Sequence, residues 1–170
     1  VLDKRLYNGR TRMLPFVMSY QSTGIVDSNG RVWVTGYGGN GLGLGSTSSF
    51  YHFMPVPEQY LANITSLAIG GDNSNIVWCA ISGDETLYCW GYNGYGQVGV
   101  GDYSSPKKVP QRVLGLNGVK MVSIVRHHQG HTCATLNDHS VWCWGYNGYG
   151  QLGSGDNSNQ DSPGRVSCNA

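Results

Sequence analysis

Hydrophobic and polar residues alternate along short stretches of this chain, and no segment shows the pattern of a well-capped amphipathic helix. Residues 131–145, HTCATLNDHSVWCWG, illustrate the alternation. The β-branched, aromatic and cysteine residues of its two halves suit strands, and the Asn-Asp pair between them suits a turn. The pattern therefore predicts a strand, a turn and a strand. A less regular apolar stretch, GVKMVSIV, precedes this hairpin, and a glycine-rich loop and a polar stretch follow it.

The hairpin and its glycine-rich loop occur three times in the chain. The three copies are SNGRVWVTGYGGNGLGLG from Ser28, GDETLYCWGYNGYGQVGVG from Gly83 and NDHSVWCWGYNGYGQLGSG from Asn137. The corresponding glycines, in steps of 55 and 54 residues, are Gly36, Gly91 and Gly145. The repeats therefore span about residues 8–62, 63–116 and 117–170.

A repeat of this length is typical of solenoids, propellers and other arrays. Four short strands in about 54 residues predict one β-propeller blade per repeat, so we expect an all-β fold of three blades. Such an array is either an incomplete ring or part of a larger propeller or assembly. Repeat 1 is the most divergent, because it lacks one residue after Gly41, where the other repeats have Gln97 and Gln151.

The sequences of the three hairpin loops do not determine the turn type. Gly30 holds the third place of a three-residue loop, a place that favours a left-handed backbone. The other repeats have Glu85 and His139 there.

Composition excludes several classes of protein. The chain has 26 glycines in 170 residues, 12% charged residues and a formal net charge of +1. These values argue against a coiled coil or a charged disordered tail, and the glycines lack the collagen period. Without a basic stripe or an apolar run of about 18–20 residues, we expect neither nucleic-acid binding nor membrane insertion. The first residue, Val1, predicts a trimmed or processed chain.

The stretch HTCATLNDHSVWCWGYNGYGQLGSG from His131, followed by Pro163, resembles the regulator of chromosome condensation repeat family. The resemblance covers nearly the whole chain and is most specific in repeats 2 and 3. Repeat 1 departs from it, with Thr35 where the others have Trp90 and Trp144. The resemblance implies propeller blades. Family members usually form seven-bladed rings, and the three repeats of this chain depart from that number.

Four of the five cysteines form two pairs at equivalent repeat positions: Cys79 with Cys89, and Cys133 with Cys143. Repeat 1 lacks both members of the pair together. A three-residue hairpin loop places each pair directly opposite across two strands, where Cα atoms lie about 4.5–5.5 Å apart, within disulfide range. The nine-residue gap within each pair is not the short spacing of a zinc site. We therefore predict two disulfides.

Disulfides predict an extracellular or cell-surface protein, because the cytosol and nucleus are reducing. This compartment argues against the nuclear exchange role that the family name suggests. Cys168 has no repeat counterpart, and we predict an intermolecular disulfide, a bond to a missing segment or a free thiol.

Two further motifs lack the context that their chemistry needs. Residues 94–99 and 148–153 match GxGxxG, but no helix follows to bind a pyrophosphate, so we expect no cofactor. His127, His128 and His131 could bind a metal, but Ser22 and Val77 hold the repeat position of His131, so we expect a structural role and no metal. With no recurring Ser/His/Asp set or carboxylate pair, we expect no catalytic residue and no enzyme activity.

Two features of the loops suggest contacts at the surface. Asn63-Ile64-Thr65 is an N-glycosylation acceptor, which makes a glycoprotein one expectation. Repeated tyrosines in a glycine-rich loop form good contact surfaces for protein or sugar. These tyrosines are Tyr92, Tyr95, Tyr146 and Tyr149.

Three blades leave two faces uncovered, and uncovered faces and strand edges bind other chains. We therefore expect a secreted, non-enzymatic structural, adhesive or assembly module that binds proteins, including copies of itself, and can polymerise head to tail into a filament. The alternative is a soluble secreted binding protein, an inhibitor or a lectin-like protein, that acts through its rim loops. Carbohydrate is a second candidate ligand.

Overall fold

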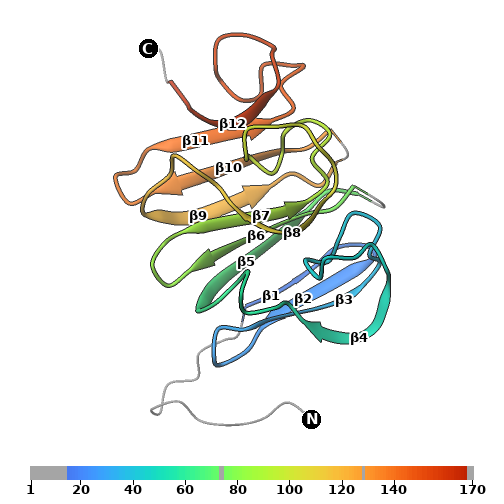
Figure 1. Ribbon diagram of the computed structural model, residues 1–170. Helices are drawn as coiled ribbons and strands as arrows, with labels where there is room; N and C mark the ends of the chain where they lie inside the picture. Colours follow the sequence, from blue (N-terminus) through green and yellow to red (C-terminus); the bar gives the residue numbers. More distant parts are fainter. Residues whose placement is uncertain (1–14, 73–74, 128, 168–170) are drawn as a thin grey trace.

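The computed structural model describes residues 15–72, 75–127 and 129–167 as three four-stranded antiparallel sheets (Figure 1). Within each sheet the strands follow chain order, so each sheet is a meander, here called a blade. Blade 1 contains β1 (Phe16–Met18), β2 (Ser22–Val26), β3 (Val32–Gly36) and β4 (Phe50–Pro55). Blade 2 contains β5 (Ile64–Gly70), β6 (Val77–Ser82), β7 (Leu87–Gly91) and β8 (Lys107–Arg112). Blade 3 contains β9 (Val119–Ile124), β10 (His131–Leu136), β11 (Val141–Gly145) and β12 (Gln160–Arg165).

The blades stack in chain order, and the core lies in the two layers between them (Figure 1). Strand β6 of the central blade is buried along its whole length. Its Trp78 and Ala80 belong to the core shared with blade 1, while Val77, Cys79 and Ile81 belong to the core shared with blade 3. A strand covered on both faces needs no polar face, so VWCAIS lacks the polar alternation seen elsewhere.

Each blade therefore has a backward face toward the preceding blade and a forward face toward the following one. Within the described residues, two of these faces have no neighbouring blade: the backward face of blade 1 and the forward face of blade 3. The predicted all-β class and propeller-type blades are confirmed, and the ring is not closed. Among the described residues, no helix is long and apolar enough to cross a membrane.

All three hairpins share one turn conformation. Gly30, Glu85 and His139 occupy the third loop position with φ of 76°, 64° and 66°. Each N–H donates to the carbonyl three residues earlier at 2.9–3.0 Å. The left-handed residue follows from this tight loop, which imposes the conformation on Glu85 and His139 despite their side chains.

The hairpins also hold the first strand of the next blade. The N–H of Ile64 donates to the carbonyl of Gly30 at 2.8 Å, and Val119 N–H donates to Glu85 at 3.0 Å. Asn63 and Gly118 precede these strands, and both have positive φ, 51° and 68°. Asn63 therefore occupies a position that glycine fills in blade 3, which gives this glycosylation candidate a structural reason to be asparagine.

Blade 1 lacks cysteines because blade 2 fills their space. A Cβ added to Gly24, the repeat counterpart of Cys79, would lie 2.6 Å from the ring of Trp78. Trp78 stacks on Trp90 with ring centroids 6.0 Å apart, and blade 3 has Thr132 in place of Trp78. The first interface thus pairs a small residue with tryptophan, and the second pairs a disulfide with threonine.

Candidate binding surface

A fully buried asparagine organises the glycine-rich loop after the third strand in blades 2 and 3. The Asn93 amide nitrogen donates to the Asp102 carbonyl at 2.8 Å, and its oxygen accepts the N–H of Val98 at 2.9 Å. Asn147 repeats the arrangement, with Leu152 N–H as its donor at 2.9 Å. Sequence analysis did not single out either asparagine, although both recur in the same GYNGYGQ stretch.

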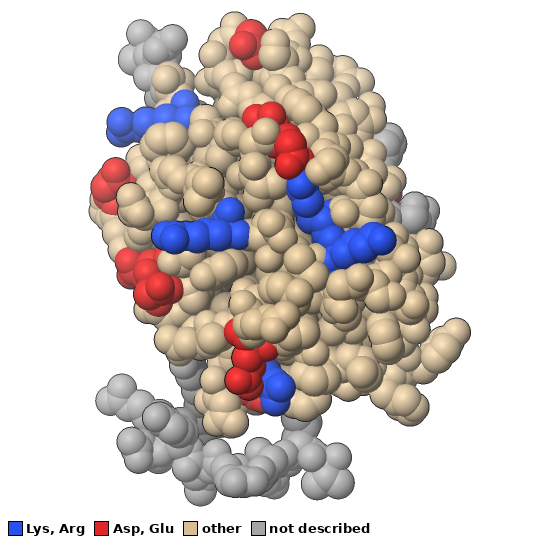
Figure 2. Space-filling view, in the orientation of Figure 1, with Lys and Arg blue, Asp and Glu red and all other residues tan. Residues whose placement is uncertain are grey.

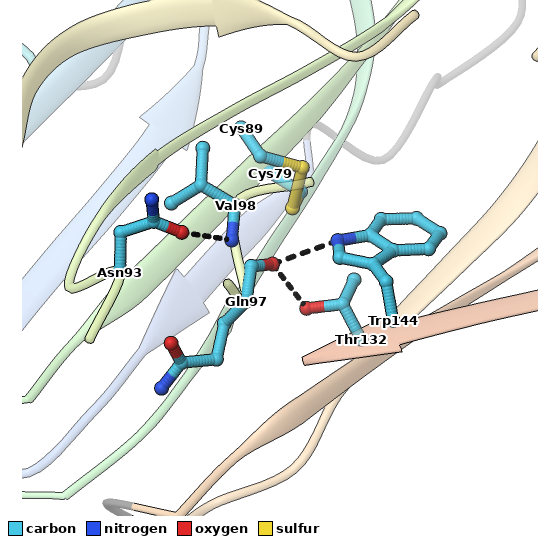
Figure 3. Close-up of a disulfide and its surroundings, with 7 residues drawn as sticks. All are labelled: Cys79, Cys89, Asn93, Gln97, Val98, Thr132 and Trp144. Carbon is cyan, nitrogen blue, oxygen red and sulfur yellow. Dashed lines mark hydrogen bonds between the residues drawn. A yellow bond between two sulfur atoms is a disulfide. The ribbon is translucent and has the colours of Figure 1, made fainter. Parts of the chain in front are cut away.

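This loop docks on the next blade through its backbone. The carbonyl of Gln97 accepts two hydrogen bonds from blade 3, from Trp144 Nε1 at 2.8 Å and from Thr132 Oγ1 at 2.9 Å (Figure 3). Gly99 lies so close to the indole of Trp144 that an added Cβ would be 2.5 Å from Nε1. The residues between β7 and β8 therefore clamp blade 3 to blade 2, and the GxGxxG stretch of residues 94–99 is part of this clamp.

The first interface lacks the same clamp. Trp90 is the counterpart of Trp144, and its buried Nε1 has no hydrogen-bond partner among the described residues. Blade 1 is one residue short after Gly41, at the place where Gln97 supplies its carbonyl. The deletion thus removes the acceptor that Trp90 would use, and a buried unpaired N–H destabilises the fold.

This difference predicts unequal effects of tryptophan-to-phenylalanine substitutions. Trp144→Phe loses a buried hydrogen bond to Gln97, whereas Trp90→Phe removes a donor that has no partner. We expect Trp144→Phe to lower the free energy of unfolding by about 1–2 kcal/mol more than Trp90→Phe does. Urea unfolding of both variants measures the difference. Equal losses would show that the Gln97 contact contributes nothing.

The four tyrosines of the two complete loops form one continuous row across the blade boundary. Ring centroids lie 6.2 Å apart for Tyr92 and Tyr95, 5.2 Å for Tyr95 and Tyr146, and 6.1 Å for Tyr146 and Tyr149. Successive rings meet edge to face, a favourable aromatic geometry. Burial raises the pKa of Tyr92, and the nearby Tyr95 raises it further. Tyr149, at the end of the row, is 86% exposed.

The structure places both cysteine pairs at disulfide distance. In each pair the two residues lie directly opposite, with Cα atoms 4.1 Å apart. Cys79–Cys89 lies inside the core between blades 2 and 3, next to the clamp (Figure 3). Cys133–Cys143 lies on the forward face of blade 3, on which no other described blade packs.

Two further titratable groups are His131 in β10 and Asp102 in the loop between β7 and β8. Burial lowers the pKa of His131, which lies on the forward face of blade 3. A hydrogen bond from Lys107, followed by bonds from Ser104, holds the pKa of Asp102 at about 2, so the carboxylate of this loop is ionised at neutral pH. No group of three metal-binding side chains occurs within the described ranges. His128 and Cys168 lie outside the described residues.

Charge is mixed on the face shown in Figure 2, where acidic and basic side chains form small neighbouring groups. A shallow hollow of about 420 Å³ lies among the first strands β1, β5 and β9. Arg126 of blade 3 reaches across this hollow, and its Nη2 donates to the carbonyl of Met18 in blade 1 at 2.9 Å. The hollow is lined mostly by aliphatic side chains.

The residues on the two faces without a described neighbouring blade, the forward face of blade 3 and the backward face of blade 1, follow from the strand register. The strand residues on the forward face of blade 3 are His131, Cys133, Thr135, Val141 and Cys143. Two loop residues, Tyr149 and Gly155, are added to this face as the repeat counterparts of Tyr95 and Gly101. The backward face of blade 1 consists of Phe16, Met18, Thr23, Ile25, Trp33 and Thr35, of which Phe16 and Met18 are 62% and 53% exposed. Register assigns these faces, because directly opposed strand residues point to the same side.

Comparison with known proteins identifies the repeats. A family model described as the Regulator of chromosome condensation (RCC1) repeat matches residues 84–135 and 138–169. The ultraviolet-B receptor UVR8 of Arabidopsis thaliana is 30% identical over 136 residues, which cover 79% of this chain and 30% of the receptor. The human probable E3 ubiquitin-protein ligase HERC6 is 31% identical over 115 residues, which cover 66% of this chain and 11% of the ligase.

The fold also matches solved structures. Prp20p from Saccharomyces cerevisiae, whose binding to Gsp1p and histones has been characterised, superimposes with a TM-score of 0.72 at 15% sequence identity. The match covers 90% of this chain and 38% of the yeast chain. This chain therefore spans less than two fifths of each of these three proteins. From its repeats, its blades and these matches, we conclude that the chain belongs to the regulator of chromosome condensation (RCC1) repeat family.

Proposed function

We propose that this chain is a non-enzymatic assembly module that works outside the reducing cytosol and binds proteins through an uncovered blade face. One observation carries the proposal: the forward face of blade 3 repeats the loop residues by which blade 2 holds blade 3, but no other described blade lies on it. Tyr95 packs between Tyr92 and Tyr146 and is half-buried, whereas its counterpart Tyr149 is 86% exposed.

The relatives support a binding role. UVR8 is a receptor, and Prp20p binds Gsp1p and histones. HERC6 is a probable ligase, but this chain spans only 11% of it, so no ligase reaction is assigned here. The buried polar side chains of the loops, Asn93 and Asn147, are engaged in holding the loops together, which suits a scaffold.

The two cysteine pairs support an extracellular or cell-surface location, because such bonds persist in oxidising compartments. Adhesion between cells or within a surface layer fits this location. Glycosylation of Asn63 stays a prediction, and its exposed side chain is compatible with modification.

The experiment is site-specific photo-cross-linking in the native host. Tyr149 is replaced by the photoreactive p-benzoylphenylalanine, and a second variant carries it at Leu114, which is 67% exposed on the connection between blades 2 and 3. We expect protein adducts from position 149 and none of the same adducts from position 114. No adduct at 149, or the same adducts at both positions, would contradict the proposal.

The alternative is a soluble binding protein that uses its rim. The continuous tyrosine row favours it, because four rings in line form a surface on which a protein loop or a sugar chain can lie. In that case the ligand contacts Tyr92 and Tyr95 as well as Tyr149, and the chain stays a monomer.

A further inference from the structure

We infer that Tyr95 and Tyr146 form a covalent modification site, at which oxidation joins the two rings as dityrosine and links blade 2 to blade 3. The rings come from different blades, 51 residues apart in the sequence, and their centroids lie 5.2 Å apart. Theirs is the shortest of the three ring contacts in the tyrosine row, and it is the one that crosses the blade boundary. The two rings therefore meet within one folded chain.

The loop of blade 2 holds Tyr95 against blade 3. The N–H of Tyr95 donates to Oε1 of Gln97 at 2.8 Å. The carbonyl of the same Gln97 accepts the bonds from Trp144 and Thr132 that clamp the loop to blade 3. Tyr95 is thus tied to the residue that docks the loop, and this keeps its ring beside the next blade.

Blade 3 holds Tyr146 from the other side. Tyr146 follows β11 directly, and its N–H donates to the carbonyl of Gly130 at 3.1 Å. The phenol end of its ring lies over Gly148, where an added Cβ would be 2.6 Å from Cζ and 3.2 Å from Cε2. A side chain at position 148 would displace the ring, so this glycine determines where the phenol of Tyr146 lies.

The reaction is a balanced two-electron oxidation, and its oxidant is hydrogen peroxide activated by a haem peroxidase. Each phenol loses one electron and its hydroxyl proton, which leaves a tyrosyl radical with unpaired spin on the oxygen and on the two ring carbons beside the phenol carbon. One such carbon of Tyr95 bonds to one of Tyr146. The hydrogen on each bonded carbon then moves to the phenol oxygen, which restores both aromatic rings. The peroxide takes up the two electrons and two protons and leaves as two water molecules.

Contact in the folded chain makes this pair couple within one molecule. Coupling between two chains is a bimolecular step, whereas rings that are held in contact react as neighbours. Both rings are half-buried, which leaves part of each open to oxidation and shields the rest from the tyrosines of other chains. A bond across 51 residues also restricts the unfolded chain, so it stabilises the contact between blades 2 and 3.

Peroxidase treatment of the purified chain tests the site. The product is separated by size under denaturing and reducing conditions, so that only covalently monomeric chains are kept. Trypsin then places Tyr95 in the peptide of residues 32–107 and Tyr146 in the peptide of residues 127–165. We expect these two peptides to be joined, to have lost two hydrogen atoms and to show the fluorescence of dityrosine.

Single phenylalanine variants identify the reacting rings. Tyr95→Phe and Tyr146→Phe should each lower the yield of joined peptides by about tenfold or more, because phenylalanine has no phenol to oxidise. Tyr92→Phe is the matched control, because the ring of Tyr92 lies 6.2 Å from that of Tyr95 but in the same loop, and its yield should stay close to that of the parent. Absence of joined peptides from the parent, or their survival in Tyr95→Phe or Tyr146→Phe, would overturn the inference.

Two glycine variants test the position of the ring without removing a phenol. Gly148→Ala puts a Cβ where the phenol end of Tyr146 lies, and Gly94→Ala does the same to Tyr92, whose Cζ would be 2.7 Å away. Neither glycine has a positive φ, so alanine fits the backbone at both positions. We expect Gly148→Ala to lower the yield of joined peptides several-fold more than Gly94→Ala does. Equal yields would mean that the contact between Tyr95 and Tyr146 does not direct the coupling, and the inference would fail.

Discussion

Replacing Cys79 and Cys89 together with alanine is expected to lower the free energy of unfolding by about 3 kcal/mol or more. The pair closes a loop of ten residues' separation, and releasing such a loop increases the entropy of the unfolded chain by about this amount. Both side chains are fully buried in the core between blades 2 and 3, so their removal also leaves a cavity. For a protein with a typical stability of about 5–15 kcal/mol, the loss is severe.

The matched control is the double alanine variant of Cys133 and Cys143. Its loop has the same separation. Cys143 is buried, but neither cysteine of this pair belongs to the cores between the blades, so the cavity contribution is smaller. In urea unfolding, we expect this variant to lose less free energy of unfolding than the Cys79/Cys89 variant loses. Reducing both disulfides of the unaltered chain should lower the free energy of unfolding at least as much as the Cys79/Cys89 double substitution does. A chain that keeps its stability after reduction would remove the physical support for an extracellular location.

Gly24→Val is expected to destabilise the chain by about 2–3 kcal/mol, although valine suits a strand better than glycine does. The added Cβ would lie 2.6 Å from the ring of Trp78 and 2.9 Å from Leu67. Trp78 is fully buried and stacked on Trp90, so its ring has no free space to enter. Thr23→Val, one residue away on the backward face, is the control and should be close to neutral.

A double-mutant cycle with Trp78→Thr tests this steric explanation. Threonine is the blade 3 residue at this position, and on its own it should cost about 3–5 kcal/mol through the lost tryptophan packing. In its presence valine at position 24 should fill part of the space, giving a coupling energy of at least about 1 kcal/mol. Additive losses would show that the space around Gly24 does not depend on Trp78.

The blades and their cysteine pairs are readable from the sequence because both depend on local spacing. A period of two residues places Cys133 and Cys143 on one side of neighbouring strands, and a short hairpin brings them opposite each other. The same logic predicted a left-handed residue at Gly30. It left Glu85 and His139 open, because the conformation there follows from the tight loop rather than from the side chain.

The clamp between blades was not predicted. Asn93 and Asn147 are ordinary turn residues by type, and their complete burial depends on a loop that folds back over them. The Trp90 indole N–H has no hydrogen-bond partner among the described residues because of two features far apart in the sequence. One is the deletion after Gly41 in blade 1, and the other is the tryptophan itself in blade 2, 49 residues further along. Such a pairing becomes visible only when the two blades are in contact.

The amino-acid sequence thus determines the number of blades, their strand order and the similarity of their loops, because a repeated local pattern folds into a repeated local structure. Tertiary structure decided which faces are covered and which are open. It made Tyr95 part of an interface and left its copy Tyr149 in solvent, and it gave Gly24 a reason to be glycine. The physical reason is that strand formation depends on neighbours two residues apart, whereas burial depends on neighbours one whole blade away.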